Sequence, residues 1–292
     1  MRTRTGGFRI GFRRGWSDWQ KDLPALATWA KDAGFEAIDL AQARPEDIGQ
    51  VRDAGLQVVS VDMLDWSALL SPDAGKRRSA IARNAAYFKE MATLGVQVFF
   101  TVAIPEDPSR PGKDNFDLAV ASYGDLAPVA ESLGATIALE GWPGSPPFAN
   151  LCCNPETCRA MFREVPCRGL GINYDPSHLI RMGIDHARFA AEFADRIIHL
   201  HAKDTEIITD NLYEIGLYQQ SIFQKPFFCG EFVWRYTIPG HGVARWSHIL
   251  AILAKSGFGG VVSVELEDAE YNGTELGEQT GLLASLQYLE TV

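Results

Sequence analysis

The chain has few of the features that membrane, secreted or nucleic-acid-binding proteins require. None of its apolar stretches is long enough to cross a bilayer without interruption. The N-terminal segment 8–14, Phe-Arg-Ile-Gly-Phe-Arg-Arg, is too short and too charged for the apolar core of a signal peptide. The five cysteines form no Cys-x-x-Cys pair, which argues against a disulfide framework or a zinc ribbon. We therefore expect a cytoplasmic location, free thiols and no membrane partner.

Positive charge is also scarce. Lys and Arg number 27 against 37 Asp and Glu, which gives a formal net charge of −10. Because a phosphate backbone is bound through a basic surface that releases counterions, this charge argues against a nucleic-acid partner. A small neutral or metal-chelating substrate fits better.

With 46% hydrophobic residues the chain can bury a full core, and we expect residues 1–292 to form a single domain.

Strand and helix patterns alternate along the chain. Eight short apolar runs, rich in β-branched or aromatic residues, are typical of buried parallel strands: Phe8–Phe12, Ala37–Leu40, Gln57–Val61, Val96–Val102, Thr136–Leu139, Gly171–Tyr174, Ile197–His201 and Val261–Leu266. Helical patterns follow them at Trp19–Ala33, Pro45–Ala54, Lys76–Leu94, Phe116–Leu133, Pro155–Val165, His186–Phe193, Arg245–Lys255 and Glu275–Leu289. This alternation predicts an α/β fold, a single (β/α)8 TIM barrel.

One connection is far longer than an ordinary loop between a strand and a helix. Residues 205–242 follow the seventh predicted strand and carry eight aromatic side chains. Long loops in compact domains are usually functional or disordered, and so many aromatics argue against disorder. The segment is either a lid or wall over the barrel mouth, or an oligomer contact or small satellite core.

Four polar residues lie at or near the C-terminal ends of separate predicted strands: Glu140, Asp175, His201 and Glu265. In a parallel barrel these strand ends meet at one face, which is where TIM-barrel active sites are built. Three carboxylates and one imidazole form an oxygen-rich cage suited to one divalent cation. The sequence therefore predicts a metal site at the barrel mouth.

Spacing alone leaves parts of this site open. Glu140, taken by itself, is more simply a carboxylate facing solvent just past its strand. Glu267 shares a strand face with Glu265, and we favour Glu265 because it lies within the apolar run. His199 and His201 also share a face, and His201 is nearer the mouth. We expect His199 to be a hydrogen-bonded core histidine in the layer beneath.

Further residues near these strand ends are candidates for substrate binding. In Asp175-Pro-Ser-His178 the proline fixes the exit from the strand and places His178 on the same side of a tight turn, although Asp-Pro-Ser is also ordinary turn chemistry. Trp142 lies in a Gly-Trp-Pro-Gly turn directly after Glu140. Lys203 and Asp204 either hold substrate hydroxyls and orient a metal ligand, or form a surface ion pair.

The predicted site suggests a mechanism. A divalent ion held by these four residues binds a substrate carbonyl and its neighbouring hydroxyl, and polarises the carbonyl. The adjacent C–H becomes acidic, so one glutamate, Glu140 or Glu265, removes the proton while the other returns one. The reaction then passes through an enediolate.

Four motifs carry a resemblance to the xylose isomerase-like TIM barrels, often called sugar phosphate isomerase/epimerase proteins: Gly171-Ile-Asn-Tyr-Asp-Pro-Ser-His178, His199-Leu-His-Ala-Lys-Asp204, Ile238-Pro-Gly-His-Gly242 with Trp246, and Ser263-Val-Glu-Leu-Glu-Asp268. The resemblance covers nearly the whole chain. It implies that Glu140, Asp175, His201 and Glu265 bind one divalent ion, Mn2+ first, with Co2+, Mg2+ or Zn2+ as alternatives.

The resemblance also assigns roles in the reaction. It implies that Glu140 and Glu265 are the acid/base pair, as in ketose 3-epimerases, and that His178 hydrogen-bonds a substrate oxygen. Arg235 resembles the arginine that grips a substrate hydroxyl or carbonyl in these proteins, and a solvated arginine in a lid is the alternative.

The substrate class stays open at this point. The main interpretation is a metal-dependent sugar isomerase or epimerase, and the alternative is a lyase that cleaves 3-keto-glycosides by β-elimination from the same site. A barrel that serves only as a binding or partner subunit is a third interpretation, and a homo-oligomer is compatible with each. A repair endonuclease is set aside, because it needs extra histidines at the ends of earlier strands. All six histidines of this chain lie at or after His178. Ala41, Asp62 and Met63 close the second and third strands, so we expect no early metal ligand.

Overall fold

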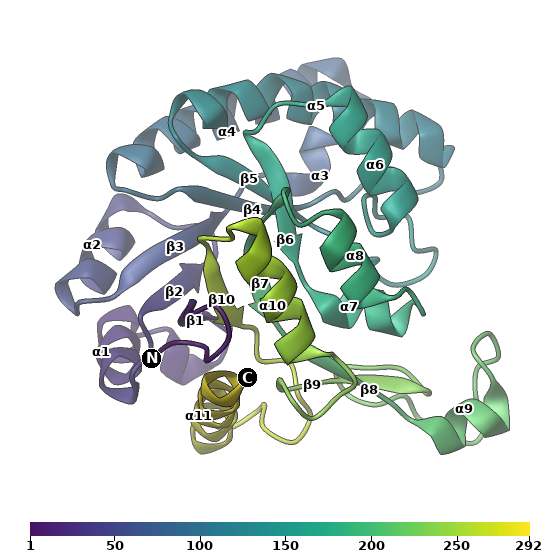
Figure 1. The fold of residues 1–292 in the computed structure, drawn as a ribbon. Helices are drawn as coiled ribbons and strands as arrows, with labels where there is room; N and C mark the ends of the chain where they lie inside the picture. The colour runs from purple at the N-terminus through teal and green to yellow at the C-terminus, as the bar shows by residue number, and fades with distance from the viewer.

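The computed structural model describes residues 1–292, and its centre is a closed barrel of eight parallel strands (Figure 1). Around the barrel the strands follow the order β1-β10-β7-β6-β5-β4-β3-β2. Their bounds are β1 Arg9–Arg13, β2 Ala37–Leu40, β3 Gln57–Asp62, β4 Val98–Val102, β5 Thr136–Glu140, β6 Leu170–Tyr174, β7 Ile197–Ala202 and β10 Val261–Val264. The predicted (β/α)8 TIM barrel is confirmed, with each strand within two residues of its predicted limits.

Helices cover the outside of the barrel and connect its strands (Figure 1). Those that the sequence patterns predicted are α1 Leu23–Ala33, α2 Pro45–Asp53, α4 Ala74–Thr93, α5 Gly112–Ser132, α6 Pro155–Glu164, α8 His186–Glu192, α10 Trp246–Ser256 and α11 Glu275–Thr291. Helix α1 illustrates how their limits are set. It begins after Asp22, whose side chain accepts a hydrogen bond from the Ala25 amide, and it ends at Gly34 with a φ of 99°.

Short elements that the sequence patterns did not predict complete the loops. They are the 3-10 helix η1 Asp18–Gln20 and the helices α3 Trp66–Leu69, α7 Pro176–Arg181 and α9 Thr209–Ile215. Single turns such as α3 and α7 are too short to show a 3.6-residue repeat of apolar residues. Helix α7 is the important one, because it directly follows β6 and carries His178.

The barrel interior is packed in layers from its N-terminal end to its mouth. The lowest layer is a cluster of small apolar side chains, Ala37, Val59, Val98, Ala138 and Val261. Two residues further along their strands lie Asp39 on β2 and Ser263 on β10, both polar and at most 1% exposed, whereas β3 and β4 carry the apolar Val61 and Phe100 there. The layer at the mouth holds the predicted metal ligands. The barrel interior therefore becomes more polar toward the mouth.

The long segment after β7 forms a two-stranded antiparallel sheet, β8 Asp204–Ile207 with β9 Trp234–Thr237. We call residues 208–233, which lie between these strands, the arm. Figure 1 shows α9 and the adjoining part of the arm projecting away from the barrel. Large apolar side chains on it are exposed by 66–95%: Tyr213, Leu217, Tyr218, Ile222, Phe223 and Phe228. The lid and oligomer-contact interpretations of the arm stay predictions.

Candidate metal centre and active site

The four predicted metal ligands lie together at the mouth of the barrel. One ligand atom from each of Glu140, Asp175, His201 and Glu265 lies within 4.8 Å of the others. They follow or end β5, β6, β7 and β10, which are consecutive in the barrel, so one arc of the wall supplies all four. Three of them are buried, and the Glu265 side chain is 15% exposed. That small exposure leaves the cluster open on the side of β10.

His201 stands at the centre of this cluster. Its Nδ1 atom lies 2.9 Å from Oε1 of Glu140 and 3.4 Å from Oε2 of Glu265. Burial alone would lower the pKa of His201, but the two carboxylates outweigh it and raise that pKa to about 10. In turn, the imidazole holds the pKa of Glu140 far below its ordinary value against the effect of burial. Both glutamates are therefore ionised and directed at one point.

The donor set fits a hard divalent cation. The Oδ2 atom of Asp175 is buried and has no hydrogen-bond partner, while its Oδ1 atom accepts a hydrogen bond from the Ser177 amide at 2.8 Å. Burial raises the pKa of Asp175 above its ordinary value, although His178 and the Lys203 ammonium, whose Nζ atom lies 3.3 Å from Oδ2, oppose that shift. Oxygen-rich sites with one imidazole suit ions such as Mn2+, Mg2+ and Zn2+. Asp175 therefore has one oxygen available as a ligand.

Two basic side chains hold Glu265 in place. Lys203 is 2% exposed, and its Nζ atom lies 2.6 Å from Oε2 of Glu265 and 2.9 Å from Oε2 of Glu267. Arg13, on β1, forms a bidentate pair with Asp62 at 2.8–2.9 Å, and its Nε atom lies 3.4 Å from Oε1 of Glu265. Although burial would raise the pKa of Glu265, Lys203 and His201 lower it well below its ordinary value. Glu265 is thus kept as a carboxylate.

His178 lies beside the acidic cluster, as the Asp-Pro-Ser-His turn predicted. Its Nε2 atom is 3.3 Å from Oδ2 of Asp175 and 3.5 Å from Oε2 of Glu140. Its Nδ1 atom is 2.8 Å from the hydroxyl of Tyr236 on β9. The β8–β9 sheet therefore contributes a side chain to the centre, and the residue that reaches it is Tyr236.

Three residues predicted to contact substrate, Asp204, Arg235 and Trp142, make no hydrogen bond or ion pair with the acidic cluster. Asp204 is fully buried, and its two carboxylate oxygens accept hydrogen bonds from the amides of residues 205, 240 and 244 and from the Trp246 indole. This position favours a structural role for Asp204 over substrate contact. Arg235 pairs with Glu206 at 2.6 Å and Glu270 at 2.9 Å. Trp142 is half-buried directly after β5.

A second acidic residue lies beneath the cluster and was missed in the sequence. Asp39, on β2, has Oδ2 at 2.9 Å from Nε2 of His199 and at 3.9 Å from Nε2 of His201. Ser60 donates a hydrogen bond to its Oδ1 atom at 2.8 Å. His199 is fully buried and hydrogen-bonded, as expected for a core histidine. The expectation that the early strands supply no metal ligand stays a prediction, but β2 does place a carboxylate, Asp39, on the far side of His201.

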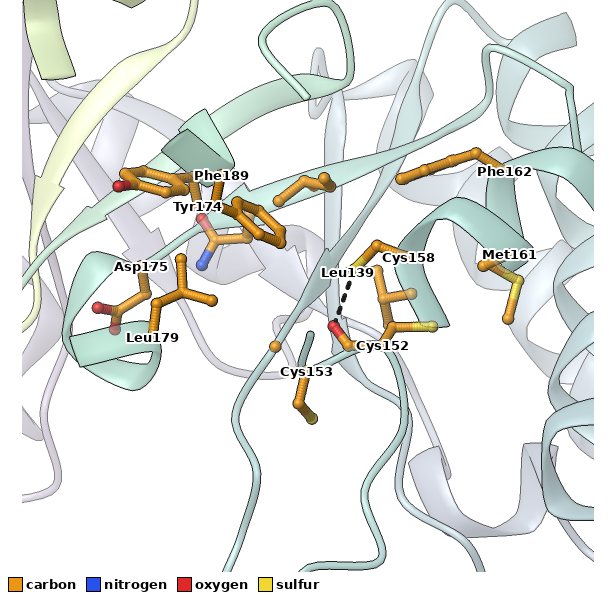
Figure 2. Close-up of a pocket in the computed structure, with 13 residues that line it drawn as sticks. Leu139, Cys152, Cys153, Cys158, Met161, Phe162, Tyr174, Asp175, Leu179 and Phe189 are labelled. Carbon is orange, nitrogen blue, oxygen red and sulfur yellow. Dashed lines mark hydrogen bonds between the residues drawn. The ribbon is translucent and has the colours of Figure 1, made fainter. Parts of the chain in front are cut away.

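Another side chain without a sequence signal is Asn173 on β6. Its Nδ2 atom donates to Oε1 of Glu140 at 2.6 Å and so fixes the orientation of that carboxylate. Its neighbours on the strand, Ile172 and Tyr174, face outward and line an apolar pocket between the barrel wall and α6, α7 and α8. Figure 2 shows this pocket with Asp175 at one end, the cysteines 152, 153 and 158 toward the middle, and Met161 and Phe162 at the other end. The pocket lies behind the centre and is mostly hydrophobic, so it is packing space outside the acidic cluster.

Comparisons with known proteins agree with this architecture. A curated inosose dehydratase of Geobacillus thermodenitrificans (strain NG80-2) is 26% identical over 246 residues, which cover 80% of this chain and 78% of that protein. The uncharacterised protein YfiH of Bacillus subtilis (strain 168) is 30% identical over 179 residues, 60% of this chain. That match spans 52% of YfiH, about half its length.

Solved structures of similar fold include several sugar enzymes. The 3-keto-D-glucoside 4-epimerase YcjR of E. coli superposes with a TM-score of 0.68 at 15% identity, covering 97% of this chain and 98% of that one. D-Psicose 3-epimerase of Clostridium cellulolyticum H10 superposes with a TM-score of 0.68 at 18% identity, covering 97% of this chain and 100% of that one. The IolI protein, solved with a bound zinc atom, superposes with a TM-score of 0.68 at 18% identity, covering 96% of each chain. At these identities the similarity shows the fold.

No helix of this protein combines the length and apolar character needed to span a membrane.

A family model described as xylose isomerase-like TIM barrel matches residues 27–292, which is most of the sequence. The eight-stranded barrel and the acidic cluster at its mouth agree with that match. The chain therefore belongs to the xylose isomerase-like TIM barrel family.

Proposed function

We propose that the protein is a divalent-metal-dependent sugar isomerase or epimerase, which removes and returns a proton next to a substrate carbonyl. The observation that carries this proposal is the convergence of Glu140, Asp175, His201 and Glu265 within 4.8 Å. The named activities of similar proteins, an inosose dehydratase and two sugar epimerases, are all sugar chemistry and support it. The cation is Mn2+ in the first instance, with Co2+, Mg2+ and Zn2+ as alternatives.

In this proposal Glu140, Asp175, His201 and Glu265 hold the ion. When bound, the ion polarises the carbonyl of the sugar and makes the neighbouring C–H acidic. Glu265 is the proton acceptor, because Lys203 and Arg13 keep it ionised and fixed. Loss of that proton converts the ketose into an enediolate.

The opposite carboxylate completes the reaction. Glu140 is oriented by a hydrogen bond from Asn173. It is ionised in the free protein, so it must take up a proton from solvent before it can deliver one to the enediolate, while Glu265 keeps the proton that it removed. Return of the proton to the neighbouring carbon gives an isomer, and return to the opposite face of the same carbon gives an epimer. His178, 3.5 Å from Glu140, is placed to donate a hydrogen bond to a substrate oxygen. Lys203 lies close enough to Glu265 for contact with substrate hydroxyls as well.

A lyase acting on 3-keto-glycosides is the second candidate. Proton removal at C2 of such a sugar, followed by loss of the C1 substituent with its bonding electrons, leaves an enone and the free aglycone. The observation that favours it is an aromatic wall near His178: the Arg181 guanidinium lies 4.7 Å from the ring centroid of Trp234 and 5.7 Å from that of Tyr236. Such a wall suits an aglycone. The other aromatics of the segment lie on the exposed arm and give this candidate no support.

One experiment separates these candidates. Manganese-loaded protein is incubated in D2O with a panel of free ketoses and with a 3-keto-glucoside, and the products are followed by NMR. Deuterium in an isomerised or epimerised sugar supports the main proposal, whereas release of aglycone with an unsaturated keto-sugar supports the lyase. Glu265→Gln is the control, because it retains the shape of the side chain and removes the base. Metal binding without exchange or turnover in either substrate would instead indicate a non-catalytic barrel.

A further inference from the structure

His178 and Tyr236 form a buried pair that joins the long insertion to the acidic cluster. The Tyr236 hydroxyl lies 2.8 Å from Nδ1 of His178, and the two residues are 5% and 2% exposed. The rings meet edge to face, with centroids 5.5 Å apart and an interplanar angle of 71°. Arg181 and Lys203 contact the Tyr236 ring at 5.7 Å and 4.5 Å from its centroid, so the ring is held from two sides.

The surroundings of the other ring nitrogen decide which one carries the proton. Nε2 of His178 is buried and lacks a hydrogen-bond partner, and it faces Oδ2 of Asp175 at 3.3 Å and Oε2 of Glu140 at 3.5 Å. These carboxylate oxygens offer lone pairs to Nε2, and two lone pairs repel each other, so a proton is favoured on Nε2. In a neutral imidazole Nδ1 must then be the acceptor, and the Tyr236 hydroxyl the donor.

Tyr236 is suited to this donor role. Burial raises the pKa of its phenol well above the ordinary value, so the hydroxyl retains its proton at any working pH. That hydroxyl has no carboxylate or carbonyl as an acceptor, and its one hydrogen-bond partner is Nδ1 of His178. The donor and acceptor are thus matched with no competing contact.

We propose that Tyr236 is a positioning residue that fixes His178 as the tautomer protonated on Nε2. His178 then always presents an N–H to the space beside Glu140, where it binds an oxygen that gains negative charge as the substrate loses its proton. Its effect on turnover rests on the proposed function, whereas the tautomer itself does not. The site would consequently prefer a substrate with a carbonyl or an oxyanion at this position over one with a hydroxyl that must donate.

The variant Tyr236→Phe tests this proposal directly. It keeps the ring against Arg181 and Lys203 and removes only the hydroxyl, so we expect the fold to persist. In 15N-histidine-labelled, magnesium-loaded protein, the ring-nitrogen shifts of His178 should show Nε2–H alone in the parent and a mixture of tautomers in the variant. The His178→Gln spectrum assigns the signal. Tyr213→Phe, altered at a side chain that is 87% exposed on the arm, is the matched control and should leave the spectrum unchanged.

Kinetics give a second readout. On the ketose that turns over, Tyr236→Phe should lower kcat by about tenfold, the worth of one hydrogen bond, with little change in KM. An Nδ1–H or doubly protonated His178 in the parent, or a tautomer unchanged by Tyr236→Phe, would overturn the proposal. If no sugar in the panel reacts, the proposed function fails. The tautomer measurement needs no turnover, so it still decides whether Tyr236 fixes the tautomer of His178. A variant that does not fold leaves the parent spectrum as the deciding measurement.

Discussion

Asp39 faces His201 from the side of the imidazole opposite to the acidic cluster, with Oδ2 of Asp39 3.9 Å from Nε2 of His201. The Nε2 atom of His201 has no hydrogen-bond partner, while Nδ1 points at Glu140 and Glu265. Carboxylates that accept a hydrogen bond from a metal-bound histidine orient it and increase its basicity. At 3.9 Å Asp39 acts on His201 through its negative charge. The relationship gives β2 a part in cation binding although it supplies no ligand.

The variant Asp39→Asn should therefore bind its divalent cation more weakly, by about 10–100-fold. The amide keeps the size of the side chain but carries no charge to stabilise the proton on Nε2 of His201. Calorimetric titration with Mn2+ measures the change. Asp117→Asn, on the exposed face of α5, is the control and should bind like the parent. Equal affinities for Asp39→Asn and the parent would show that Asp39 serves only the core pair with His199.

Cation affinity should depend on pH through His201. Its pKa is raised from 6.5 to about 10, so in the metal-free protein the ring is protonated at neutral pH, and the cation must displace that proton. Affinity should rise with pH by about tenfold per unit up to about pH 10. Proton release of about one per ion, measured calorimetrically in buffers of different ionisation enthalpy, checks this. A flat profile between pH 7 and pH 9 would contradict the raised pKa.

The same shift has a consequence for the metal-free fold. A histidine whose folded pKa is raised stabilises the protein fully below its unfolded value of 6.5, and this contribution is lost as the pH rises toward about 10. Thermal unfolding of metal-free protein should accordingly show a Tm that falls between pH 7 and pH 9. A His201→Gln variant should lose most of that slope, since it lacks the titrating group.

Arg13 should be needed for activity. It links Asp62 to Glu265 through both ends of its guanidinium, and a lysine has no planar fork to make these contacts together. We expect Arg13→Lys to lower kcat by about tenfold or more, because the proton acceptor is no longer fixed. Arg9→Lys changes the same strand at its other end, near the barrel base, and is the matched control. An Arg13→Lys enzyme with parental kcat would assign Arg13 to stability alone.

Asp204 should matter for stability. Each of its carboxylate oxygens accepts two hydrogen bonds, all from N–H groups. An asparagine must turn its own NH2 group toward two of these donors in either orientation, so Asp204→Asn should cost about 3 kcal/mol of unfolding free energy. Denaturant unfolding measures it, with Asp210→Asn on α9 as the control. A stable Asp204→Asn variant with a raised KM would restore the predicted role in substrate binding.

The sequence was most informative where the signal is local. Each barrel strand shows its own apolar run, and each of the four ligands lies at the end of such a run, so topology alone brought them together. His178 was found for the same reason, because it lies one turn from Asp175. These predictions needed no knowledge of side-chain packing between distant elements.

The residues that were missed depend on contacts between distant parts of the chain. Asp39 is one polar residue in the run Ala-Ile-Asp-Leu, and its partner His199 lies 160 residues away. The pair Arg13 and Asp62 joins β1 to β3 in the same way. Neither spacing nor composition signals such partners.

The prediction that Arg235 contacts substrate depends on strand pairing within the insertion. The register between β8 and β9 decides which face of β9 meets the barrel. In this register Arg235 lies opposite Glu206. Resemblance pointed to Arg235, whereas alternation along the strand turns the neighbouring Tyr236 toward His178. A shift of one residue in the pairing of β8 with β9 would have turned Arg235 toward the barrel and Tyr236 away from it.

Asp175 serves two structures with one carboxylate. Its Oδ1 atom caps the first turn of α7 through the Ser177 amide, and its Oδ2 atom is free to bind a cation. An ion that immobilises this side chain also immobilises the cap, so amide hydrogen exchange in residues 177–181 should slow when the site is filled. Helix α7 would thereby act as a built-in reporter of metal occupancy, which can be followed in solution before any substrate is known.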